Sequence, residues 1–216
     1  MSRWVIQKGF GRIEYAYHQM AIAAGMEMTE CRLLEESGRA HFMTRRFDRD
    51  IQGGKIHMQS LCALGHYDFN AAGEYGYEQA LSVIQRLNLG HAVMRQMYRR
   101  MLFNVLARNQ DDHTRNIAFL MDQDGQWGLA SAFDVIWSYN PTGTWTNRHQ
   151  MSINGKRDGF TRADLLTVAE TFGIKDGAGL IEQVTTAVAE WPRFAKEAGV
   201  PKHQLQIVGE THRLTL

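Results

Sequence analysis

The stretch NQDDHTRN, residues 109–116, interrupts the apolar pattern of the chain. It contains carboxylates, amides, an imidazole and a guanidinium but no apolar side chain. Residues of these types are rarely buried without partners, so we expect a loop outside the core. Its density of polar groups makes this loop the first candidate for a functional site.

The segments on either side of the loop predict how it is held. Apolar residues before it recur every three or four positions, which is typical of a buried helix that ends just before Asn109. They are Met94, Met97, Tyr98, Met101, Leu102 and Val105. After the loop, IAFLM (117–121) and QWGLA (126–130) flank Asp124-Gly125, a pattern that predicts a β-hairpin. Asp134 follows this hairpin.

The N-terminal part of the chain contains both helical and strand patterns. Apolar residues at helical spacing predict a helix over residues 12–24, and a similar stripe predicts another over residues 77–87. Between them, residues 31–48 form two runs around Ser37-Gly38, which indicates a hairpin.

The C-terminal third begins with a polar and aromatic loop over residues 139–158. Thr161, with Asp164 three positions later, resembles a capping box and predicts the start of a helix. A last apolar stripe over residues 180–191 predicts a helix that Pro192 kinks or ends.

Composition indicates a soluble globular protein. Of 216 residues, 44% are hydrophobic and 22% are charged, and 24 Lys and Arg nearly balance 23 Asp and Glu. This balance gives no reason to expect nucleic acid or a membrane as a partner. Cys31 and Cys62 are isolated, which favours neither a zinc site nor a disulfide framework. With no apolar leader or membrane-length segment, we expect an unexported, cytoplasmic protein.

The order of helix, polar loop, hairpin and aspartate suits phosphoryl transfer. That reaction uses a carboxylate to accept a hydroxyl proton, and an amide with a second carboxylate to hold magnesium. Asp111 precedes Asn116 by five positions, which is the spacing of a kinase catalytic loop, and Asp134 follows the hairpin. The alternative is that these residues only form turns and helix caps, as Asp and Asn often do in loops.

The strings ARNQDDHTRNIAF and AFDV, with RRFDR at residues 45–49, resemble the HipA-like serine/threonine kinase family over nearly the whole chain. The resemblance implies a bilobal, protein-kinase-like fold. It also implies the toxin of a bacterial toxin–antitoxin system that phosphorylates protein substrates such as an aminoacyl-tRNA synthetase. A helix-turn-helix antitoxin would be its partner, and ATP and Mg²⁺ its cofactors.

The same resemblance implies roles for individual residues. Asp111 would be the catalytic base, and Asn116 and Asp134 would be the magnesium ligands. Arg115 would be the basic residue beside the phosphates. At residues 132–135 the chain reads AFDV, where other protein kinases have DFG, and in this respect it is similar to the HipA-like family.

RRFDR resembles the hinge between the two lobes of a kinase. The backbone near Arg45 and Phe47 would then contact adenine, and Asp48 would contact the ribose. Alternatively, Phe47 is part of the core, and Asp48 pairs with Arg46 or Arg49 at the surface.

The start of the chain departs from the family pattern. Glu14 resembles the helix glutamate that pairs with the nucleotide-binding lysine, yet Lys8 lies only six positions earlier and Gln7 occupies the expected lysine position. Together with a poor glycine-rich loop, this predicts a chain lacking most of the N-terminal lobe. We expect residues 1–49 to be a remnant of that lobe and hinge, and residues 50–216 to be a helical C-lobe.

Other polar residues have structural interpretations. Asp112 is expected to accept hydrogen bonds in a turn, and His113 to be a hydrogen-bonding residue rather than a metal ligand. The loop 139–158 mixes aromatic and basic groups, so nucleic-acid binding is a third, lower-ranked hypothesis. Its residues of this kind are Trp145, Arg148, His149, Lys156 and Arg157.

The sequence therefore predicts an α+β, mostly α-helical fold: a protein-kinase-like C-lobe with a small β-hairpin remnant of the N-lobe and hinge. The predicted function is a HipA-like kinase domain that transfers the γ-phosphoryl group of ATP to a protein Ser or Thr. The alternative is a catalytically inactive, truncated C-lobe that acts as a protein-binding module.

Overall fold

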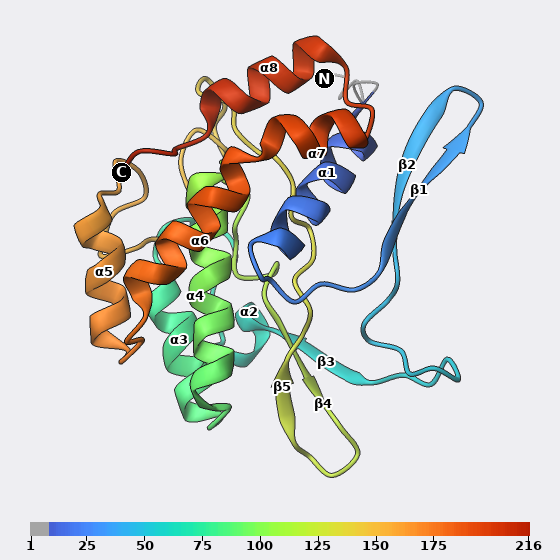
Figure 1. Ribbon diagram of the computed structural model, residues 1–216. Helices are drawn as coiled ribbons and strands as arrows, with labels where there is room; N and C mark the ends of the chain where they lie inside the picture. Colours follow the sequence, from blue (N-terminus) through green and yellow to red (C-terminus); the bar gives the residue numbers. More distant parts are fainter. Residues whose placement is uncertain (1–8) are drawn as a thin grey trace.

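The computed structural model describes residues 9–216, and within that range the chain forms eight helices and five strands (Figure 1). Gln7 and Lys8, the two candidates for the position of the nucleotide-binding lysine, lie outside the described residues. In that part of the chain, no helix is both long and apolar enough to cross a lipid bilayer.

Helix α1 and the hairpin that follows it form one side of the molecule (Figure 1). α1 (Phe10–Ala23) confirms the predicted first helix, and β1 (Cys31–Glu36) pairs antiparallel with β2 (Arg39–Thr44). Ser37 and Gly38 between the strands have φ values of 50° and 73°. Positive φ at both positions is the geometry of a two-residue type I′ turn, which explains why Ser37-Gly38 predicted the hairpin correctly.

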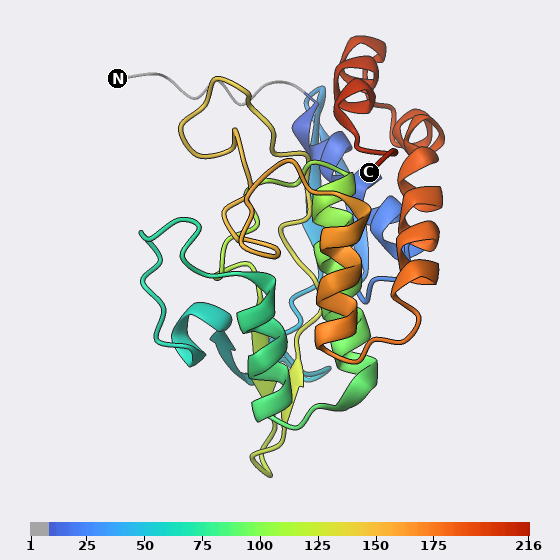
Figure 2. The same ribbon diagram turned by 90° about the vertical axis from the view of Figure 1, so that its left-hand side faces the viewer.

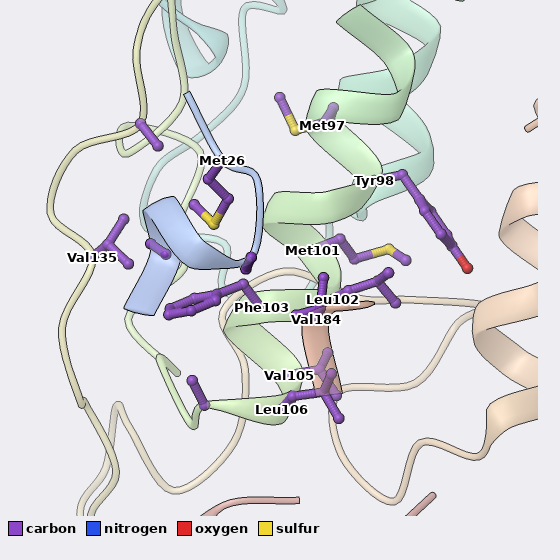
Figure 3. Close-up of a cluster of buried hydrophobic side chains, with 14 of the residues drawn as sticks. Met26, Met97, Tyr98, Met101, Leu102, Phe103, Val105, Leu106, Val135 and Val184 are labelled. Atoms are coloured by element: carbon purple, nitrogen blue, oxygen red, sulfur yellow. The ribbon is translucent and has the colours of Figure 1, made fainter. Parts of the chain in front are cut away.

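The centre of the fold is α4 (Gly90–Leu106), the predicted buried helix. α3 (Tyr77–Arg86) packs along one side of it and α6 (Gly177–Ala189) along another, as Figure 2 shows. Figure 3 shows Met26 and Val135 on the same side of α4 as Phe103. Phe103 is fully buried, and burial of a side chain of this size stabilises the fold by about 1.5–3 kcal/mol. The helix that leads into the polar loop is therefore firmly held.

The hairpin after the loop belongs to a sheet of three strands. β4 (Ala118–Met121) pairs with β5 (Trp127–Leu129), as predicted, and on its other edge with β3 (His57–Ser60), which was not predicted. β3 leads directly into the short helix α2 (Leu61–Leu64). The expectation of a two-stranded hairpin was incomplete because β3 has four residues and no clear apolar alternation.

The C-terminal helices cover the other flank of the core. Thr161 is the N-cap of α5 (Arg162–Thr171), and its side chain forms the predicted capping box with Asp164. α6 ends at Ala189, and Pro192 lies in the first turn of α7 (Trp191–Glu197), so the proline ends one helix and begins another. α8 (Lys202–Thr211) completes the chain. α7 packs against α1, which brings both ends of the described chain into one core.

Candidate active site

The loop over residues 109–116 holds its two adjacent aspartates in opposite environments. The Asp111 side chain is 46% exposed, whereas the Asp112 side chain is 0% exposed. Backbone hydrogen bonds fix the start of the loop beside a later segment, since Gln110 N donates to Ser138 O at 3.1 Å and Ser138 N donates to Arg108 O at 3.1 Å. One aspartate is therefore available to a ligand and the other is part of the interior.

The structure brings Asp111, Asn116 and Asp134 together, although they come from different segments. Asn116 Nδ2 donates to Asp134 Oδ2 at 2.9 Å and to the backbone oxygen of Asp111 at 3.0 Å. Asp134 has a φ of 54°, a left-handed conformation that Asp adopts more readily than most residues. Asn109 Nδ2 lies 3.4 Å from the backbone oxygen of Asp134.

The oxygen donors of these three residues have the chemistry that a magnesium ion prefers. The amide nitrogen of Asn116 donates to Asp134 Oδ2 at 2.9 Å, so the amide would turn over for its oxygen to bind an ion together with Asp134. Mg²⁺ prefers oxygen ligands and usually binds one or two carboxylates together with the phosphates of the substrate. Burial raises the pKa of Asp111, and the nearby charges of Asp134 and Asp112 raise it further, while His113 acts in the opposite direction. This concentration of negative charge is suited to a cation.

Glu14 of α1 lies close to the same group. Burial, together with the negative charge of Asp134, raises the pKa of Glu14 to about 7. The structure thus places the predicted helix glutamate beside the predicted metal ligand. A carboxylate in this position needs a cation nearby to remain charged at neutral pH.

We expect Glu14→Gln to stabilise the protein at pH 8. The folded state holds the proton of Glu14 up to about pH 7, whereas the unfolded state releases it near 4.5. The free energy of unfolding of the natural chain should therefore fall as the pH rises through this window, by about 1–3 kcal/mol after allowance for partial exposure. Urea denaturation at pH 5 and pH 8 measures the difference, which the glutamine variant should lack.

Glu170→Gln on the exposed face of α5 is the matched control for this charge change. It should leave the pH dependence of stability unaltered. A Glu14→Gln protein that is no more stable than the natural chain at pH 8 would contradict the prediction.

The predicted hinge residues lie beside a shallow hollow. Arg45 and Phe47 both line it, and Leu120 of β4 and Leu129 of β5 provide apolar wall. The ring of Phe47 packs on the ring of Phe133, with centroids 5.2 Å apart. Phe133 directly precedes Asp134 in the sequence. The lining of this hollow is mixed, because Glu30 and Asp50 lie in it together with arginines and apolar side chains.

Asp48 makes the ion pairs with Arg46 and Arg49 that were considered as its alternative role, but its own side chain is only 11% exposed. Its carboxylate accepts hydrogen bonds from Arg46 Nε at 2.8 Å and from Arg49 Nη1 at 2.7 Å. The hydrogen bond from Arg46 is the largest of the effects that hold the pKa of Asp48 below its usual range. Asp48 therefore orders the predicted hinge segment, and a ribose hydroxyl would have to share its carboxylate with two arginines.

Arg115 is exposed, and its guanidinium lies 3.8 Å from the centroid of the Phe69 ring. Phe69 also contacts the His113 ring edge to face, with centroids 4.9 Å apart. The basic side chain of the loop is thus held by a cation–π contact at the rim of the site.

A buried hydrogen-bond network around Asp112 was not predicted as such. Asp112 Oδ2 accepts from His149 Nδ1 at 2.8 Å and from the Tyr77 hydroxyl at 2.9 Å, while Oδ1 accepts from Gln150 N at 2.8 Å. Burial alone would raise the pKa of Asp112, but the contact with His149 and the bonds from Gln150 and Tyr77 hold it below its usual range. The expectation that Asp112 accepts hydrogen bonds is confirmed.

The network continues to the other side of the site. Asn104 Nδ2 donates to the Tyr77 hydroxyl at 2.8 Å, and Asn109 Nδ2 donates to Asn104 Oδ1 at 3.0 Å. Through Asn109 it reaches the backbone oxygen of Asp134. Side chains from α3, α4 and two loops therefore fix the loop that carries Asp111. The one sequence signal for this buried network was Asp112 itself, a second carboxylate directly after the predicted base Asp111.

The structure gives little support to nucleic-acid binding by loop 139–158. His149 is buried against Asp112, Arg157 Nε donates to His149 O at 2.6 Å, and Lys156 pairs with Asp164 at 2.8 Å. Trp145 is 63% exposed. Most of the proposed aromatic and basic contacts are thus already engaged within the chain.

Comparison with known proteins yields one family and several similar proteins. The family model for the HipA-like C-terminal domain matches residues 2–208. A Haemophilus influenzae protein named "Putative kinase" is 26% identical over 140 residues, which are 57% of this chain and 40% of that protein.

Two solved structures share the fold. One is the Shewanella oneidensis MR-1 complex of HipA, HipB and operator DNA, with a TM-score of 0.73, 18% identity, and coverage of 97% of this chain and 54% of the other. The second is the Helicobacter pylori proinflammatory kinase CtkA, with a TM-score of 0.55, 12% identity, and coverage of 97% and 85%. The chain thus spans about half the length of the first structure, and less of the Haemophilus protein.

Proposed function

Because this chain belongs to the family of HipA-like C-terminal domains, we propose that it is a kinase lobe that transfers the γ-phosphoryl group of ATP to a Ser or Thr of a protein. The observation that carries the proposal is the convergence of Asp111, Asn116 and Asp134, joined by the two hydrogen bonds of the Asn116 amide. The kinase-like fold supports it.

Each residue has a role that follows from its position. The exposed carboxylate of Asp111 accepts the proton of the acceptor hydroxyl, whose oxygen forms the new bond to phosphorus while the bond from phosphorus to the ADP oxygen breaks. Asn116 and Asp134 would hold Mg²⁺, which neutralises charge on the phosphates when bound. Arg115 lies at the rim, where the phosphates would pass. Arg45 and Phe47 would border the base.

The biological setting is part of the proposal. We place the chain in a toxin–antitoxin system, with a helix-turn-helix antitoxin as partner and a cytoplasmic protein, such as an aminoacyl-tRNA synthetase, as substrate. The matched Shewanella structure, which contains HipA, HipB and operator DNA, supports this setting. Residues 1–49 would belong to the nucleotide-binding lobe and hinge, and residues 50–216 to the catalytic lobe.

One observation favours a second function, a protein-binding lobe without turnover. The pKa of Glu14 is raised to about 7 by burial and by the charge of Asp134, and within residues 9–216 no basic group acts in the opposite direction. An active kinase pairs the corresponding glutamate with a lysine that contacts the phosphates. The two functions differ in whether the chain binds ATP.

We expect calorimetric titration with ATP to show binding that requires Mg²⁺ and is lost in Asp134→Ala. The loss follows because the variant removes a carboxylate that holds the ion. Asp124→Ala, at the exposed tip of the β4–β5 hairpin, removes the same charge outside the site and should bind as the natural chain does. No heat from the natural chain would reject the kinase function for this chain and favour the protein-binding lobe.

A further inference from the structure

Three buried polar atoms around the catalytic loop have no hydrogen-bond partner among the described residues. They are Nε of Arg100, Oδ1 of Asn109 and Nδ1 of His113. All three residues line one hollow, which Asn116 and Asp134 also line. A buried polar atom without a partner costs about 1–3 kcal/mol, so three of them beside one hollow indicate a shared partner.

The hydrogen bonds that Arg100 and Asn109 already make determine whether their remaining atoms donate or accept. Arg100, on α4, is 5% exposed, and its Nη2 donates to Ala130 O at 2.6 Å, which leaves Nε–H as a donor. Asn109 uses its Nδ2 toward Asn104 Oδ1 and the backbone oxygen of Asp134, which leaves Oδ1 as an acceptor. The hollow therefore presents one donor, one acceptor and one imidazole nitrogen.

The hollow has enough room for one water molecule. Its volume is about 20 Å³, and a single water needs roughly 10–15 Å³ by the same measure together with two to four polar partners. We propose that one water molecule is bound there, accepting from Arg100 Nε and donating to Asn109 Oδ1 and His113 Nδ1. This arrangement satisfies all three atoms and uses both protons of the water.

The bound water sets the tautomer of His113. A neutral imidazole whose Nδ1 accepts a hydrogen bond carries its proton on Nε2. His113 Nε2 lies 3.9 Å from Asp111 Oδ1, so a proton on Nε2 places partial positive charge near the exposed carboxylate. The Phe69 ring, packed on the His113 ring, limits rotation of the imidazole. His113 is then a positioning residue for Asp111, a role that rests on the proposed function.

The site is tested first on the unaltered chain. Nitrogen-15 NMR of the imidazole at a pH where His113 is neutral should show Nε2 protonated and Nδ1 accepting. A crystal structure that resolves ordered waters should show one between the three atoms. A neutral Nδ1–H tautomer, or an ordered crystal in which the hollow is empty, would overturn the inference.

Arg100→Met removes the donor to the water while keeping an apolar stem of similar length. We expect it to abolish the preference for Nε2–H and to lower kcat about 10-fold with little change in KM, since orienting partners typically contribute this much. Arg99→Met is the matched control, because Arg99 is also buried on α4 but donates to Gln183 Oε1 at 3.2 Å, away from the hollow. That variant should keep the tautomer.

The two readouts separate the water site from the proposed function. The tautomer is measured without ATP, so its result decides the water site even if the chain neither binds nor turns over nucleotide. An Arg100→Met protein that folds and retains the Nε2–H preference would overturn the role of Arg100. If Arg100→Met does not fold, the measurements on the unaltered chain decide.

Discussion

Asp111→Asn is expected to lower the rate of phosphoryl transfer about 10²–10⁴-fold, the usual contribution of a general base. Asparagine has the same shape but cannot accept the proton of the acceptor hydroxyl. The substitution leaves the loop intact, because Asn116 bonds to the backbone oxygen of Asp111 rather than to its carboxylate. Transfer is measured as phosphate incorporated from labelled ATP into dephosphorylated casein.

The same variant should bind magnesium and ATP as the natural chain does, whereas Asp134→Ala should not. This contrast separates loss of the base from loss of the metal site. Because burial is the main effect that raises the pKa of Asp111, the acidic limb of the natural pH–rate profile should lie above the ordinary range for an aspartate, with activity rising as the carboxylate loses its proton. Undiminished transfer by Asp111→Asn would remove Asp111 from the role of base.

The elements that could be predicted from sequence are those with local signals. Helix α4 follows from its apolar spacing, and the β1–β2 hairpin from the turn residues Ser37 and Gly38, which adopt the positive φ that this turn requires. β3, α2, α7 and α8 were not predicted. β3 is held by pairing with β4, far away in sequence, and α8 buries only Gln204 and Val208, too few residues to give a stripe.

The candidate site divides in the same way. The spacing of Asp111 and Asn116, and the position of Asp134 after a hairpin, indicated that these residues act together, and the Asn116 hydrogen bonds join them. The supporting network could not be predicted, because Tyr77 and His149 come from segments whose proximity only the fold creates. His149 shows the limit of composition: it was grouped with nucleic-acid contacts, yet its side chain is 0% exposed.

Asp112→Ala is expected to lower the free energy of unfolding by about 3–5 kcal/mol, since it leaves the buried partners of a carboxylate unpaired. Three donors, from His149, Tyr77 and the backbone of Gln150, would lose their acceptor. Urea denaturation with an unchanged m-value measures the loss. The adjacent Asp111→Ala is the control, and it should cost less than about 1 kcal/mol because its side chain is partly exposed.

Two further measurements distinguish the buried pair from a general packing defect. His149→Leu should also destabilise the protein, but Asp112→Ala with His149→Leu should lose less than the sum of the single variants, because the two side chains share one interaction. The depressed pKa of Asp112 adds stability above the ordinary aspartate pKa of 3.8, which is lost as the pH falls through the lower folded value. Asp112→Asn should lack this acid-dependent loss. Additive effects and an unchanged acid limb would show that Asp112 does not act as a buried carboxylate that fixes the catalytic loop.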